Sequence, residues 1–258
     1  FSWNANLNFS HYKNKVVKLN DEVQSIGGDI RLMEGQPMGV YYGYVADGLF
    51  QTKDEVYNAA TQQGAAPGRI RYRDINCDGK ITDADQCIIG DPNPDFAAGL
   101  NLDFNYKNWT LSAFFTGEFG FDIINSTKRQ LQFMSYGGVS TNRSKDILNC
   151  WSATNPNSSI PAISLTDNNN EMRMSTYFVE DGSYVKMKYL KLGYSFPSKL
   201  TNKWCQSLSI YAQVENLFTI TGYHGLDPEL PLAGYGSRVD SGVYPNSRTF
   251  TLGLNLQF

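Results

Sequence analysis

The sequence lacks the marks of a helical membrane protein and of a nucleic-acid-binding protein. None of its 258 residues belongs to an apolar run of about 18, so it contains no transmembrane helix. Lysine and arginine total 22 against 25 acidic residues, which gives a net charge of −3. Because no basic run occurs, we expect no nucleic-acid partner.

Metal-binding cysteine and histidine motifs are also missing. The chain has 4 cysteines and 2 histidines, and no two cysteines form a CxxC pair. A zinc site is therefore not expected. Cys77 and Cys87 bracket a polar loop; a disulfide between them and two unpaired thiols are both compatible with this spacing.

Catalytic motifs are missing as well. The sequence shows no nucleophile elbow, phosphate-binding loop or Ser/His/Asp grouping. Two acidic pairs occur, Asp83 with Asp85 and Asp227 with Glu229. The first belongs to a polar ion-binding loop, and the second lies in a proline-containing stretch. We therefore expect no enzyme activity.

What the chain does have is long, regular alternation of apolar and polar residues. In FSWNANLNFS, apolar side chains from Phe1 to Phe9 alternate with serine and asparagine. Period-two alternation over eight to twelve residues predicts strands with one apolar face and one polar face. About six segments show it: FSWNANLNFS, LNLDFNY, WTLSAFFTGEF, SYVKMKYLKLGYSF, SLSIYAQVENLF and TFTLGLNLQF. In SYVKMKYLKLGYSF the apolar phase slips between Tyr189 and Leu190, which predicts a β-bulge there.

The connections between these strands differ greatly in length. Residues 107–108 form a tight turn and residues 197–206 a fairly short link, whereas three connections are long: 11–94, 121–182 and 224–246. Short turns at one end and long loops at the other are typical of outer-membrane β-barrels. Aromatic residues near strand ends suit interfacial girdles: Trp3, Tyr106, Trp109, Tyr194 and Phe258.

These patterns predict an all-β fold, namely a portion of a transmembrane antiparallel β-barrel with long extracellular loops. The polar inner face suits a watery lumen, and a soluble antiparallel sheet with one solvated face is the alternative. Six strands do not close such a barrel, since bacterial single-chain barrels have at least about eight and plugged ones about 22. Phe1 is not an initiator methionine. We therefore expect that 1–258 is one segment of a longer, 22-stranded barrel whose plug domain lies elsewhere.

The loop YRDINCDGKITDAD follows the spacing of a calcium-binding loop. Such loops take oxygen ligands from positions 1, 3, 5, 7 and 12, and need glycine at position 6. Counting from the first aspartate predicts these ligands: Asp74, Asn76, Asp78, the carbonyl of Lys80, and Asp85. The alternative interpretation is a polar turn without an ion.

The residues on either side of this loop favour a structural ion over a calcium sensor. A sensor needs amphipathic helices on both sides, but GRIRYR before the loop alternates like a strand. CIIGDPNPDF after it carries a glycine and two prolines. We expect structural Ca²⁺ that ties the long first connection into one shape.

Several long segments resemble one family. GRIRYRDINCDGKITDADQCIIGDPNPDFAAGLNLDFNYKNWTLSAFFTGEFGFDIIN, SYVKMKYLKLGYSFP, QVENLFTITGYHGLDPE and YPNSRTFTLGLNLQF are similar, in this order, to the C-terminal third of SusC/RagA-type TonB-dependent outer-membrane transporters. Cys77, Cys87 and Cys150 depart from the residues expected there. The plug domain, the TonB-box segment and the N-terminal barrel strands have no counterpart in the sequence.

The resemblance implies a multi-pass protein of the Gram-negative outer membrane, embedded in outer-membrane lipid, that imports oligosaccharides or peptides. It further implies two partners, a SusD-like surface lipoprotein that acts as a lid and the TonB complex, which would act through the missing N-terminal part. The alternative is a soluble calcium-dependent carbohydrate-binding β-domain. In that domain Tyr41, Tyr42 and Tyr44 would form a platform for sugars, whereas in the transporter they pack the base of a loop.

Overall fold

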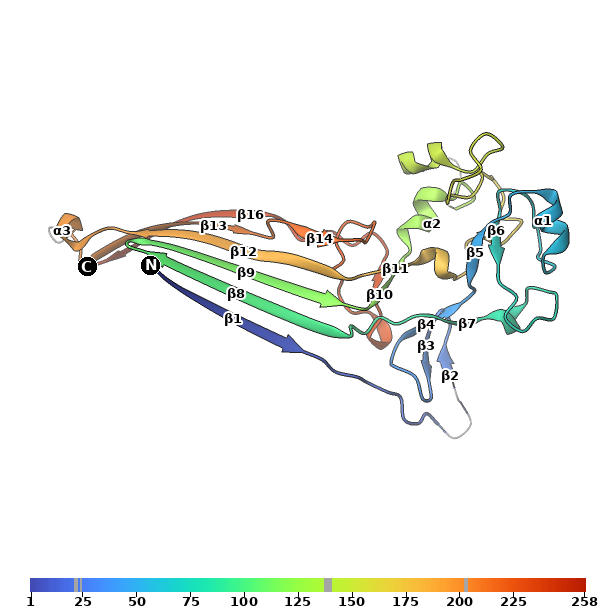
Figure 1. The fold of residues 1–258 in the computed structure, drawn as a ribbon, viewed down its shortest axis with the longest axis horizontal. Coiled ribbons are helices and arrows are strands. Elements are labelled where there is room, and N and C mark those ends of the chain that lie inside the picture. Colours follow the sequence, from blue (N-terminus) through green and yellow to red (C-terminus); the bar gives the residue numbers. More distant parts are fainter. Residues whose placement is uncertain (21–22, 24, 137–140, 202–203) are drawn as a thin grey trace.

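The computed structural model describes residues 1–20, 23, 25–136, 141–201 and 204–258. Long antiparallel strands form a wall on one side, and the long connections fold into a separate mass at one end of it (Figure 1). None of the described helices combines the length and the apolar character that a membrane crossing needs.

The wall is one sheet of long antiparallel strands, as the alternation predicts. Its order is β1-β8-β9-β12-β13-β16, with a short seventh strand, β14 (Thr219–Thr221), paired to β12. The six long strands are β1 (Ser2–Ser10), β8 (Phe96–Tyr106), β9 (Trp109–Phe119), β12 (Tyr184–Ser195), β13 (Ser207–Glu215) and β16 (Thr249–Gln257).

The pairing register keeps the apolar side chains on one face of this sheet. One row across the wall runs through Leu102, Ala113, Leu190 and Val214 to Phe250. Because side chains alternate between faces, the neighbouring row is polar: Asn4, Asp103, Ser112, Lys191, Gln213 and Thr251. The wall therefore has one continuous apolar face and one polar face, and it is not two stacked sheets.

The apolar face carries aromatic side chains at both ends. The five predicted girdle residues lie at the end with the short turn, where the Trp109 and Tyr194 rings are 4.7 Å apart. At the other end Phe9, Phe96 and Phe119 form a second row, with centroid distances of 5.2 and 4.7 Å. This second aromatic row was not predicted from the sequence.

The predicted bulge exists, but its predicted position was wrong. The register between β12 and β9 shifts between Met187 and Tyr189, so the extra residue is Lys188, one position before the Tyr189–Leu190 step at which the bulge was predicted. The alternation by itself does not locate the extra residue, because Tyr189 suits either face. Its ring packs against Phe114 on the polar face, 5.8 Å between centroids.

The short turns and the long connections lie at opposite ends of the wall (Figure 1). The β8–β9 turn is two residues long, and Lys107 takes a positive φ of 53°. The β12–β13 link contains α3 (Ser198–Thr201). The three long connections all leave the wall at its other end.

The long connections form small sheets and short helices of their own. The first contains a four-stranded sheet of β2 (Ser25–Gly27), β3 (Ile30–Met33), β4 (Val40–Gly43) and β7 (Cys87–Gly90), then β5 (Ala46–Leu49) paired with β6 (Ile70–Tyr72), and α1 (Lys53–Asn58). The second and third contribute β10 (Asp122–Asn125), β11 (Val179–Asp181) and β15 (Val239–Asp240), which form a three-stranded sheet, and α2 (Thr127–Gln132). Four 3₁₀ turns complete the described helices: Asp83–Asp85, Lys145–Asn149, Thr176–Phe178 and Gly234–Gly236.

The hydrophobic core lies among these connections and not beneath the wall. Tyr41, Ile70, Ile123 and Phe178 are fully buried there, whereas Leu252 on the wall is 87% exposed. The Tyr41 hydroxyl lies within 3.0 Å of the backbone oxygens of Asp122 and Arg238, so it joins all three connections. The connections therefore fold as one body.

Candidate functional site

The calcium-like loop is held between two short strands. β6 ends at Tyr72, and β7 begins at Cys87. Between them Thr82 caps the 3₁₀ turn Asp83–Asp85, and its side chain and that of Asp85 form a reciprocal capping box. The segment before the loop is a strand, as predicted, and the segment after it is a short strand where the sequence predicted only the absence of a long helix. The loop therefore has no flanking pair of helices that a sensor would move.

Carboxylates of the predicted ligands close the loop by accepting hydrogen bonds from its backbone N–H groups. Asp74 Oδ1 accepts the N–H of Cys77 at 2.7 Å, and Asp74 Oδ2 accepts that of Gly79 at 2.8 Å. Asp85 is fully buried and accepts the N–H of Ile75 at 2.9 Å and that of Thr82 at 2.7 Å. Burial alone would raise the pKa of Asp85, but these donors outweigh it and hold the pKa below its ordinary value.

Only some of the predicted ligands lie together. Asp74 lies beside Asp85, while the Asn76 amide nitrogen donates to Asp78 Oδ2 at 3.1 Å. Over the described ranges, no three His, Cys, Asp or Glu side chains converge closely enough to form a metal cluster. The chemistry of the oxygens nevertheless fits calcium, since a carboxylate oxygen that accepts one N–H retains capacity for a second interaction. Cys77 and Cys87 are both free thiols, which settles the open question about this pair.

A charged cluster ties the third connection to the polar face of the wall. Lys186 on β12 is 1% exposed, and its Nζ lies 2.8 Å from both Asp227 oxygens and from Glu229 Oε2. Lys188 also bonds Glu229, and the Asn246 amide donates to both carboxylates. The pairing was not predicted from the sequence, because Lys186 and Asp227 lie 41 residues apart along the chain.

The acids of this cluster are held in their charged form. Burial alone would raise the pKa values of Asp227 and Glu229, but the ammonium groups beside them lower both below their ordinary values. The cluster therefore acts as a charged latch, defined here as Lys186, Lys188, Asp227, Glu229 and Asn246.

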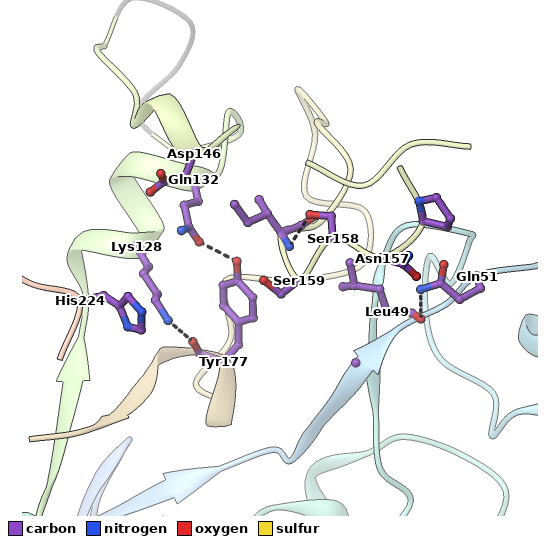
Figure 2. A pocket seen from close by; sticks show the side chains of 13 residues that line it. Leu49, Gln51, Lys128, Gln132, Asp146, Asn157, Ser158, Ser159, Tyr177 and His224 are labelled. Atoms are coloured by element: carbon purple, nitrogen blue, oxygen red, sulfur yellow. Dashed lines mark hydrogen bonds between the residues drawn. The ribbon is translucent and has the colours of Figure 1, made fainter. Parts of the chain in front are cut away.

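A large groove opens among the three connections (Figure 2). Its volume is about 1010 Å³, and it is lined by residues of all three. The Tyr177 side chain stands inside it and donates a hydrogen bond of 2.6 Å to Gln132 Oε1. Lys128 donates to the Tyr177 carbonyl at 3.1 Å and pairs with Glu180 at 2.8 Å. This groove was not predicted from the sequence, because its lining comes from segments more than 100 residues apart.

The three tyrosines of GVYYGYV pack the loop base and do not form a sugar platform. Tyr41 and Tyr44 are buried. Tyr42 is half-buried and covered by the Arg31 guanidinium, 3.7 Å from its ring centroid. Burial also raises the pKa of the Tyr41 hydroxyl.

Comparison with curated proteins gives several relatives along the whole chain. The chain is 37% identical to TonB-dependent receptor P3 of Formosa agariphila over 277 aligned positions, and 27% identical to TonB-dependent receptor SusC of Bacteroides thetaiotaomicron over 268 aligned positions. Both alignments cover 100% of this chain, but 27% and 24% of the relatives. The chain thus spans about a quarter of the length of the curated relatives it matches. No family model matches it.

Comparison with solved structures supports the same fold. The structure of the RagAB peptide transporter superposes with a TM-score of 0.79, at 23% identity, over 99% of this chain and 27% of the other. The RagAB peptide importer in its "closed-closed" state superposes with a TM-score of 0.77 at 23% identity, with the same coverage. The antiparallel wall with long connections at one end is therefore the architecture of TonB-dependent barrels, and the chain resembles the SusC/RagA-type TonB-dependent receptors along its whole length.

Proposed function

We infer that the chain forms part of a TonB-dependent outer-membrane transporter that imports oligosaccharides or peptides. The observation that carries this function is the single wall with one apolar and one polar face. In hydrocarbon every backbone polar group needs a partner, so such strands function as part of a closed barrel of about 22 strands. Aromatic rows at both ends of the apolar face support a bilayer position for it.

In this function the apolar face contacts outer-membrane lipid, and the polar face borders the lumen. The three connections 11–94, 121–182 and 224–246 lie outside the cell. There a SusD-like lipoprotein covers the barrel mouth, and the TonB complex acts through a plug contributed by polypeptide beyond this segment. The soluble β-domain is disfavoured, because Leu252 and Leu254 would face water at 87% and 59% exposure.

Uptake by the intact receptor tests this function. We expect deletion of its gene to abolish growth on one oligosaccharide or peptide source, and an outer-membrane fraction to contain the protein. Growth that is unchanged on every nutrient tested, or a protein recovered without detergent from the soluble fraction, would contradict it.

The calcium-like loop has a structural part in this proposal. Asp74, Asn76, Asp78, the Lys80 carbonyl and Asp85 would hold Ca²⁺. The ion would supply charge neutralisation and fix the loop, offsetting its conformational entropy. Calcium titration of the full receptor, followed by protease resistance of the first connection, tests the site.

A further inference from the structure

The groove of Figure 2 has a rigid floor. Tyr177 is fixed by its hydrogen bond to Gln132 and by edge-on contacts with Phe133 and Phe178, at centroid distances of 5.8 and 5.3 Å. Tyr177 is half-buried and forms part of the groove lining, and the Lys128 ammonium lies over its ring at 5.2 Å from the centroid. A rigid aromatic side chain offers contact area at a small entropic cost on binding.

The charged side chains in the lining are already paired or engaged. Lys128 is neutralised by Glu180 at 2.8 Å, and His224 Nδ1 lies 3.0 Å from the same carboxylate. Asp146 accepts the Ser144 hydroxyl at 2.7 Å. Among the described lining residues, no cation is left to pair with an anionic ligand. Asp146 would repel such a ligand.

The remaining polar groups are amides and hydroxyls. The oxygen of Gln132 accepts the Tyr177 hydroxyl, so its NH₂ group is left to donate. The side chains of Asn157 and Ser159 are exposed and make no hydrogen bond to another described residue. A mixture of donors and acceptors suits hydroxyl groups, because each hydroxyl both donates and accepts.

We propose that this groove binds a neutral, hydroxyl-rich saccharide, with a sugar ring against Tyr177 and hydroxyls bonded to Gln132, Asn157 and Ser159. The proposal rests on the import function above and names the cargo class. The volume of about 1010 Å³ is at the upper end of ligand pockets, which suits a short oligosaccharide. Acidic saccharides and peptides with charged termini would find no unpaired partner.

The first experiment finds the cargo class with the intact receptor in its bacterium. Wild-type and deletion strains are grown on neutral oligosaccharides, on uronate-containing or sulfated oligosaccharides, and on peptides of about ten residues. We expect the growth defect on a neutral oligosaccharide. A defect confined to acidic saccharides or peptides overturns this proposal and leaves the import function standing; no defect on any source overturns both.

The second experiment tests the groove itself, using purified full-length receptor and the oligosaccharide identified by growth. Gln132→Glu keeps the acceptor for Tyr177 but removes the NH₂ donor, and we expect about tenfold weaker binding. Gln130→Glu, on the same helix but outside the groove, adds the same charge and should change binding less than about twofold. Asn157→Ala, at an exposed side chain, should weaken binding severalfold without affecting folding.

Salt dependence separates neutral from charged recognition. Binding of a neutral ligand should change less than about twofold between 50 and 500 mM salt, since screening acts on charge pairs. Binding that equals wild type in both Gln132→Glu and Asn157→Ala, or that falls steeply with salt, overturns the groove assignment. Each purified variant is compared at equal protein concentration.

Discussion

The charged latch offers a prediction whose size follows from the structure. Replacing Lys186 by methionine keeps most of the side-chain volume but removes three contacts of 2.8 Å. Asp227 and Glu229 would then face each other without their buried counter-charge. Removing one partner of a buried ion pair costs about 3–5 kcal/mol. The Glu229 side chain is 28% exposed, so we expect the lower end, about 3 kcal/mol.

Amide hydrogen exchange measures this cost locally. The backbone N–H groups of Glu229 and Asn246 donate to Asp227 at 3.0 and 3.2 Å, so both report opening of the third connection. A loss of about 3 kcal/mol should lower their protection by about 100-fold at pH 7. The measurement uses the full receptor in detergent.

A matched variant provides the control. Lys188→Met removes contact with Glu229 alone, and this lysine is 29% exposed. We expect less than about tenfold loss of protection there. Equal protection in wild type and Lys186→Met, or equal effects of the two lysine variants, would refute the idea that Lys186 holds the connection.

Three further results are expected. Leu102→Arg places a charge on the apolar face and should destabilise the assembled barrel by about 2–4 kcal/mol near the bilayer midplane, whereas Asn101→Arg on the polar face should assemble normally. Heat-modifiable gel mobility compares the two variants. Equal assembly of both would contradict the assignment of the apolar face to lipid. Replacing Asp74 and Asp78 by alanine should speed protease cleavage of the first connection in calcium, and unchanged digestion argues against an ion clip. Because the folded structure lowers the pKa of Asp227, this residue contributes its full stabilisation above its ordinary pKa of 3.8 and loses it as pH falls through the lower folded pKa. Hydrogen-exchange protection of the charged latch should therefore hold at pH 6 and be lost only at strongly acidic pH.

The extent of prediction differs between the wall and the connections. The alternation of FSWNANLNFS or TFTLGLNLQF assigns each residue to a face, because period two has only two phases and hydrocarbon tolerates only one of them. The register then aligned Leu102 with Ala113 and Leu190 as those phases require. The bulge was less determinate, since Tyr189 suits either face and the pattern shifts by a residue without penalty.

The connections show the opposite case. Local spacing was enough to predict a polar loop from Asp74 to Asp85, because its oxygen-bearing residues lie within twelve positions of one another; calcium binding there stays a prediction. The groove and the latch join residues that no local pattern relates, such as Lys186 with Asp227 or Gln51 with Tyr177. Their positions depend on how three loops pack on Tyr41 and its neighbours.

The sequence by itself determined the strands and their two faces, because each short segment carries the period-two alternation within itself. Its longer motifs carried the resemblance to a family. Only the tertiary structure decided which loop residues meet. Lys186 is paired with Asp227, and Tyr41 and Tyr44 are buried, because ion pairing and burial depend on contacts between distant segments.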